Sequence, residues 1–208
     1  RNVGVASRMV YDRSVPKKML DYLSEVFELS QYDKLPEGRY HNNADFFAFP
    51  NFGMTHQQDN PQPPLPVPHL EEADSIFDVI KDKDQILHVP YQSYKPVIKF
   101  FEDAASDPNV THIKIIQYRV AKVSKIMDAL KLAVENGKQV SAFVEIKARF
   151  DEAANLVWGE RLEKAGVTVH YSMPGVKVHS KIAIVRRIED DKARLYVHLS
   201  TGNFHEDT

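Results

Sequence analysis

The second half of the chain has a pattern of apolar and polar positions that predicts alternating strands and helices. Residues 97–105, 124–136 and 151–165 are predicted helices, and Gly137 and Gly166 end the second and third of them. Alternating elements of this kind predict an α/β fold with a largely parallel sheet covered by helices on its faces. The strands are expected in the apolar stretches at 113–118, 139–146, 167–171, 181–187 and 194–199.

The first 70 residues follow a different pattern. Apolar residues at helical spacing between Met19 and Phe27 predict a short amphipathic helix over 16–28. After a cluster of phenylalanines, a proline-rich stretch runs to Pro68, where no regular element is expected because proline lacks a backbone donor and fixes φ. A connector and a ligand for a proline-binding module would both explain these prolines. We expect a boundary near residue 70, with 1–70 and 71–208 in different domains.

Composition excludes several classes of protein. The 208 residues contain no cysteine, which excludes a disulfide scaffold, a thiolate zinc site and a cysteine nucleophile. No apolar run approaches the roughly 18 to 20 residues of a membrane span. Residues 1–110 carry 11 Lys and Arg against 17 Asp and Glu, whereas residues 111–208 carry 16 against 12. An anionic ligand is therefore expected in the second half.

Chemically useful residues follow the predicted strands, where ligands of parallel sheets usually bind. These positions are Tyr118 and Arg119, residues 145–149 and residues 174–179. In the last of them, His179 and Lys181 form a His-x-Lys pair after a glycine turn, and Gly202-Asn203 follows 23 residues after the histidine.

This arrangement resembles a half-site of the phospholipase D superfamily. In that chemistry an imidazole nitrogen attacks phosphorus to form a phosphohistidine, and the ammonium two residues on, on the same face of a strand, neutralises phosphoryl oxygens. The superfamily has an acidic residue seven positions after the histidine, whereas this chain has Arg186 at that position. A second pair, His112 and Lys114, has neither the glycine turn nor the Gly-Asn partner and is interpreted as fortuitous.

Longer motifs resemble the polyphosphate kinase family, which makes long-chain polyphosphate from ATP. The most specific is Glu145-Ile-Lys-Ala-Arg149-Phe-Asp-Glu152, about 30 residues before the His-x-Lys pair, and the resemblance covers essentially the whole chain. The other motifs are Gly38-Arg-Tyr-His-Asn42, Leu87-His-Val-Pro-Tyr-Gln-Ser-Tyr94, Ile116-Gln-Tyr-Arg119, Asn136-Gly-Lys-Gln-Val140 and Ser200-Thr-Gly-Asn-Phe204.

The resemblance implies a phospholipase D-like catalytic domain over 71–208, truncated at its C-terminus. Residues 1–70 would be the end of a neighbouring helical domain with its proline-rich connector. The chain also begins at Arg1 without a methionine and has no closing terminal helix, so we expect a piece of a longer protein. A second His-x-Lys half and further ATP-contacting residues would lie beyond Thr208, and the fragment alone is expected to be inactive.

The family's site residues map onto three positions, and two further residues complete the expected site. His179 corresponds to the histidine that ATP phosphorylates, and Arg119 and Arg149 correspond to arginines beside the bound phosphates and Mg²⁺. A guanidinium has no lone pair to donate, so we expect both arginines to clamp phosphoryl oxygens near the ion rather than to ligate it. Lys181 is expected as the local charge partner and Asn203 as a group that orients the imidazole or a phosphate oxygen.

Further expectations concern ligands, location and neighbouring residues. The resemblance implies ATP as substrate with Mg²⁺, ADP and polyphosphate as partners, no nucleic acid, no integral membrane segment and a homo-oligomeric parent. It implies a cytoplasmic location, with peripheral association at the bacterial inner membrane. Glu145 is expected to hold an arginine. His198 is expected to be a packed or hydrogen-bonded histidine rather than a catalyst, and Trp158 to pack between helix and sheet rather than to stack on adenine.

Two alternatives remain at this point. A phosphodiesterase or phospholipase-like hydrolase would use the same histidine with water as the acceptor, and it would release labelled phosphate from a diester. A non-catalytic phosphate- or nucleic-acid-binding module would need only the basic second half. That module would bind oligonucleotides with a steep salt dependence and would form no phosphoenzyme.

Overall fold

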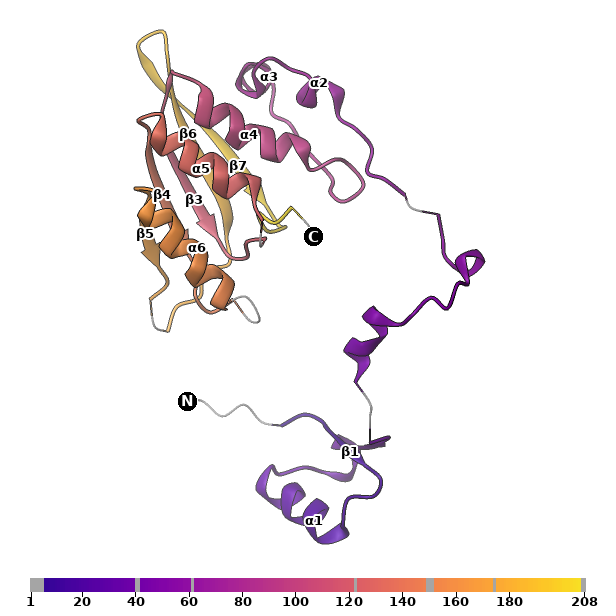
Figure 1. Cartoon of the computed structure of the whole chain (residues 1–208). Coiled ribbons are helices and arrows are strands. Elements are labelled where there is room, and N and C mark those ends of the chain that lie inside the picture. Colours follow the sequence, from indigo (N-terminus) through magenta and orange to yellow (C-terminus); the bar gives the residue numbers. More distant parts are fainter. Residues whose placement is uncertain are drawn as a thin grey trace. The chain divides into compact units, whose positions relative to one another are not determined.

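The computed structural model describes residues 6–39, 42–60, 62–121, 123–148, 152–173 and 175–206 (Figure 1). The chain divides into two compact units, one that ends at Pro61 and one that starts at Gln62. Each unit is described by itself. None of the helices in the described ranges is long and apolar enough to cross a membrane.

The first unit contains the amphipathic helix that the sequence predicts. It is α1 (Lys17–Val26), which follows strand β1 (Met9–Asp12) and precedes strand β2 (Lys34–Glu37), and the two strands pair in parallel. Short 3-10 turns cover Gln31–Asp33, Asn43–Ala48 and Thr55–Gln57.

The second unit begins with irregular chain and three helices. The proline-rich residues 62–67 contain no helix or strand apart from a single bridge between Leu65 and Gln92, as their composition predicts. The helices are α2 (Pro68–Glu71), α3 (Ile76–Asp82) and α4 (Lys95–Ser106). The last of these confirms the helix expected at 97–105.

A five-stranded sheet follows, in the order β5-β4-β3-β6-β7. Strands β3, β4 and β5 are parallel, whereas β6 is antiparallel to β3 and forms a hairpin with β7. The hairpin turns at Asp190 and Asp191, both with positive φ, as a two-residue turn between strands requires. The elements in chain order are β3 (Val110–Gln117), α5 (Lys125–Glu135), β4 (Gln139–Val144), α6 (Glu152–Lys164), β5 (Thr168–Tyr171), β6 (Lys181–Glu189) and β7 (Lys192–Ser200).

The predicted helix ends are confirmed by the backbone. Ser124 caps α5, its hydroxyl accepting a hydrogen bond from the Met127 amide. Gly137 and Gly166, just after α5 and α6, have φ of +78° and +90°, values that side chains with a Cβ rarely adopt. These glycines therefore stop the helices where the sequence predicts.

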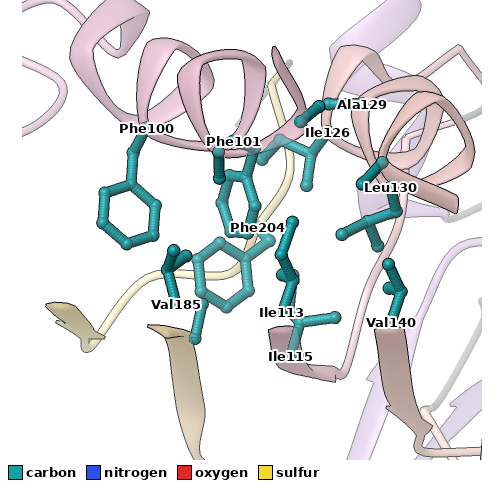
Figure 2. Close-up of a cluster of buried hydrophobic side chains, with 14 of the residues drawn as sticks. Phe100, Phe101, Ile113, Ile115, Ile126, Ala129, Leu130, Val140, Val185 and Phe204 are labelled. Atoms are coloured by element: carbon teal, nitrogen blue, oxygen red, sulfur yellow. The ribbon is translucent and has the colours of Figure 1, made fainter. Parts of the chain in front are cut away.

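Helices α4, α5 and α6 cover one face of the sheet (Figure 1). The strand order places β4 and then β5 successively further along on the same side of β3, so right-handed crossovers put α5 and α6 on the same face. The core between these layers consists mainly of apolar side chains, and Phe204 packs edge-on against Phe101 inside it (Figure 2).

The opposite face of the sheet carries no helix among the described residues. Ile116, Phe143, Ile182 and Ile184 are only partly buried there, and they line a hollow of about 360 Å³ together with Lys114, Ser141 and His170. The sequence predicted helices on both faces. The difference arises because successive crossovers in one direction supply helices to one side only.

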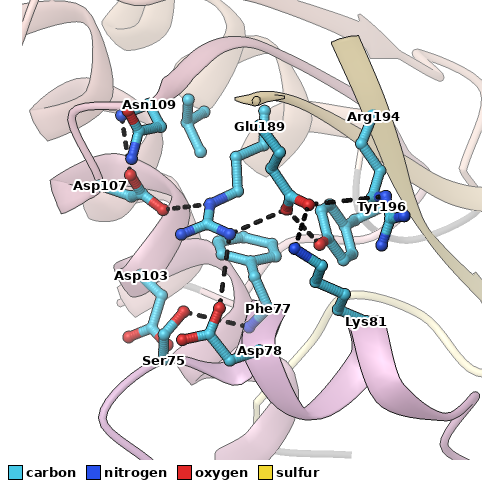
Figure 3. A network of polar contacts seen from close by, with 12 residues as sticks. Ser75, Phe77, Asp78, Lys81, Asp103, Asp107, Asn109, Glu189, Arg194 and Tyr196 are labelled. Atoms are coloured by element: carbon cyan, nitrogen blue, oxygen red, sulfur yellow. Dashed lines mark hydrogen bonds and ion pairs between the residues drawn. The ribbon is translucent and has the colours of Figure 1, made fainter. Parts of the chain in front are cut away.

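At one end of the sheet, a polar network joins α3 to the β6–β7 hairpin (Figure 3). The Glu189 carboxylate accepts hydrogen bonds from Tyr196 and Arg187 and pairs with Lys81. Arg187 also pairs with Asp107 at 2.7 Å. Burial alone would raise the pKa of Glu189, but these partners lower it to about 2, so the carboxylate stays charged.

Candidate active site

The topology brings the predicted strand ends together. Strands β3, β4 and β5 are parallel, so the residues after them, Tyr118, Glu145 and Ser172, leave the sheet at the same edge. Strand β6 is antiparallel to β3 and therefore begins at that edge, with Lys181. The segment that carries His179 connects β5 to β6 and lies there too.

The Tyr118 ring is the centre of this edge. The imidazole of His179 meets it edge-on, with 4.7 Å between ring centroids and 75° between planes. The Lys181 Nζ lies 4.8 Å from the ring centroid, the Lys177 Nζ 5.3 Å and the Arg119 Cζ 5.9 Å. One buried aromatic ring thus gathers three cations and an exposed histidine.

Lys181 supports the loop before it. Its ammonium donates a hydrogen bond to the carbonyl of His179 at 2.7 Å, and the residue is only 4% exposed. Burial lowers its pKa, and the positive charges of Arg119 and Lys177 lower it further. An anion that approached this group would relieve the repulsion, so the cluster favours a negatively charged ligand. His179 itself lies in irregular chain, not on a strand with Lys181 as expected.

Glu145 is the fully buried acid of the site. Its two carboxylate oxygens accept hydrogen bonds at 2.8 Å, one from the Lys147 amide and the other from the Val178 amide. Burial by itself would raise the pKa of this carboxyl, but the hydrogen bonds from Val178, Lys147 and Ser172 lower it overall. We expected Glu145 to hold an arginine, whereas these hydrogen bonds tie it to the backbone of two loops.

Asn155 fixes the same loops from the helix side. Its Nδ2 donates to the carbonyl of Tyr118 at 2.8 Å and to that of Glu145 at 2.9 Å. Trp158, three residues further along α6, is buried and donates from its indole to the carbonyl of Ala121. The expected packing role of Trp158 is confirmed.

Asn203 lies beyond the end of β7, at the site edge. The β6–β7 register pairs Lys181, the first residue of β6, with Ser200, the last residue of β7. The segment before β6 and the segment after β7 therefore lie at the same edge of the sheet. The carbonyl of Asn203 accepts a hydrogen bond from Tyr94 at 3.4 Å. Its side-chain Oδ1 is buried and has no hydrogen-bond partner within the described part of the chain.

Of the two arginines expected at the site, the structure describes Arg119. Arg119 is half-buried and lies against Tyr118 in the cation cluster. Arg149 lies outside the described residues. Among the described residues no three His, Asp or Glu side chains form a group that could hold a metal ion.

The second His-x-Lys pair is not at this edge. His112 lies near the start of β3 and pairs with Arg186 of β6, towards the opposite end of the sheet, and its ring contacts Thr111. His198 faces the helix layer, against Phe100 and Phe204, where burial lowers its pKa to about 4. The interior role expected for His198 is confirmed.

Sequence reasoning gave no role to Tyr118, Lys177 or Asn155. The sequence pattern predicts only that Tyr118 ends a strand, because an aromatic ring next to a buried strand resembles a core residue. Its position directly before Arg119, at the carboxyl end of a predicted parallel strand, was the available signal.

Comparisons with known proteins agree with this geometry. Residues 75–208 match the family model described as "Polyphosphate kinase C-terminal domain 1". The polyphosphate kinase of Vibrio vulnificus is 46% identical over 97% of this chain and 29% of the relative, and that of Escherichia coli is 42% identical over 97% and 30%.

A solved structure is similar along the same length. The crystal structure of polyphosphate kinase from Porphyromonas gingivalis matches with a TM-score of 0.72 at 39% identity, over 97% of this chain and 31% of that one. The chain spans less than a third of the length of these relatives. With a family model that matches most of its second unit, the chain belongs to the polyphosphate kinase family.

Proposed function

We propose that the full-length protein containing this chain is a polyphosphate kinase that uses His179 as a phosphoryl carrier. An imidazole nitrogen attacks the terminal phosphorus of ATP, the bond from that phosphorus to the bridging oxygen breaks, and ADP leaves. The terminal oxygen of a polyphosphate chain then attacks the phosphohistidine, the P–N bond breaks, and the polymer is one phosphate longer. The imidazole is restored, so the cycle can run in either direction.

One observation carries this proposal: His179 is exposed in the cation cluster around Tyr118. Phosphoryl transfer depends mainly on positioning and on stabilising the charge of the equatorial oxygens. Lys181 and Arg119 would supply positive charge within reach of the imidazole. The partnerless Oδ1 of Asn203 would orient the imidazole or the entering ligand.

Mg²⁺ belongs to the proposal as a companion of ATP. When bound, it would neutralise phosphate charge, held mostly by phosphate oxygens and water. Arg119 and Arg149 would clamp phosphoryl oxygens beside the ion, since a guanidinium offers only donors. A cytoplasmic location with peripheral membrane association, a homo-oligomeric parent and the absence of nucleic-acid partners complete the proposal on the family resemblance.

The test uses the full-length protein with ATP labelled in its terminal phosphate and Mg²⁺. We expect acid-labile labelling of the wild type, complete loss with His179→Ala, and wild-type labelling with His112→Ala. His112 is the matched control because it also precedes a lysine by two residues but lies towards the other end of the sheet. Labelling that survives in His179→Ala would overturn the proposal.

A further inference from the structure

Two loops of the site meet at a single buried carboxylate. Glu145 follows β4, and its Oε1 accepts the amide of Lys147 in its own loop. Its Oε2 accepts the amide of Val178, 33 residues away and directly before His179. Glu145 is 0% exposed, so its carboxylate oxygens are removed from water and depend on the protein for their hydrogen bonds.

The carboxylate is itself fixed from behind. The Glu145 amide donates to the carbonyl of Gln117 on β3, and its carbonyl accepts from the Asn155 side chain. The Ser172 hydroxyl accepts a hydrogen bond from the Ile146 amide and helps to lower the pKa of the Glu145 carboxyl. Glu145 thus has little freedom to follow the His179 loop, and the loop has to conform to it.

We infer that Glu145 is a positioning residue, which holds the Val178 amide so that the His179 imidazole stands against Tyr118 and faces the bound phosphate. The inference rests on the proposed function of His179. Glu145 is fully buried and its oxygens accept backbone amides, so its part is to hold the loop rather than to contact the phosphate. Its effect reaches the reaction through the backbone of one neighbouring residue.

The test variant is Glu145→Gln in the full-length protein. A glutamine side chain has one acceptor oxygen, and its NH₂ group would face the second amide, so one loop loses its acceptor. We expect the rate of phosphoenzyme labelling at saturating ATP to fall about 10-fold or more, equivalent to about 1.4 kcal/mol. The KM for ATP should change less than about 3-fold, because the cations around Tyr118 remain.

Glu189→Gln is the matched control. Glu189 is another largely buried carboxylate with several hydrogen bonds, but it lies in the network at the far end of β6 (Figure 3). Its loss should lower the melting temperature and leave the labelling rate unchanged. An equal loss of labelling in both variants would mean general destabilisation and would overturn the inference.

Two further measurements test the positioning role of Glu145: the labelling rate of a second variant and the pH profile of labelling. If Glu145→Gln does not fold, the milder Ser172→Ala decides: it should slow labelling about 3-fold, and a wild-type rate would overturn the inference. If the pH profile of labelling in Glu145→Gln lacks an ionisation present in the wild type, Glu145 acts in proton transfer instead. Wild-type labelling in Glu145→Gln, with loss in His179→Ala, would refute the positioning role while the proposed function stands.

Discussion

At the scale of single residues, Tyr118 contacts three cations and the His179 ring with one uncharged side chain. An aromatic ring offers its face to cations and its edge or face to another ring without demanding a hydrogen bond in return. Arg119, Lys177 and Lys181 can therefore be held near one another although their charges repel. The ring keeps the cations close to His179.

This role predicts different results for two substitutions of Tyr118 in the full-length protein. Tyr118→Phe keeps the ring and should retain phosphoenzyme labelling within about 3-fold of the wild type. Tyr118→Leu loses contacts worth roughly 0.5–2 kcal/mol each, and labelling should fall about 10-fold or more. The measurement is the labelling rate at saturating ATP together with the melting temperature.

Tyr196→Leu serves as the control for cavity effects. Tyr196 is equally buried, but it packs against Phe77 and bonds to Glu189 rather than lining the site. It should lose stability and keep its labelling rate. A slow Tyr118→Phe would show instead that the hydroxyl, not the ring, carries the function.

At the scale of elements, β7 places an ionisable residue in an apolar layer. His198 lies against Phe100 and Phe204, and burial lowers its pKa from 6.5 to about 4. Between pH 6.5 and pH 4, His198 is therefore protonated in the unfolded chain but stays neutral in the folded chain. Stability from this residue is fully present above pH 6.5 and is lost as the pH falls towards 4.

The predicted loss is on the order of 3 kcal/mol between pH 6.5 and pH 4, since each pKa unit is worth about 1.4 kcal/mol. His198→Leu should remove this part of the pH dependence. Urea unfolding of both proteins at pH 7, 5.5 and 4.5 measures the difference. His170→Leu, at an exposed position on β5, is the control and should keep the wild-type slope. Parallel slopes for the wild type and His198→Leu would contradict the assignment.

Elements also account for how the β7 end is held. Glu206 accepts hydrogen bonds from the Ser124 hydroxyl and the Ile126 amide at the start of α5. Its negative charge there suits the helix dipole. The segment with Asn203 is thereby tied between α4, through Tyr94, and α5.

At the scale of the whole molecule, the chain is a third or less of its relatives. Its sheet also carries partly buried apolar side chains on the face that no helix of the described residues covers. We predict that the 208-residue chain alone makes no polyphosphate from ATP, while the full-length protein does. Incorporation of labelled phosphate into polymer measures this. Turnover by the isolated chain would show that the site needs nothing outside it.

Most helices and strands of the second unit could be predicted from the sequence, because residues within or directly beside each element determine it. Apolar stretches of strand length, the Ser124 cap and the glycines after α5 and α6 act within a few residues of themselves. The His-x-Lys pair and its motifs likewise lie in continuous sequence. The role of residues 1–70 as the end of a helical domain stays a prediction, and so do the roles of His179, Lys181 and Asn203.

Only the tertiary structure decided how these pieces meet. The reversal of β6 against β3, the single helix-covered face and the partner of Glu145 depend on contacts between residues tens of positions apart. A carboxylate four residues before Arg149, in a site expected to contain Arg119 as well, looks like a partner for guanidinium. In the fold it is fully buried and accepts backbone amides from two loops, and these hydrogen bonds take the place of a side-chain ion pair.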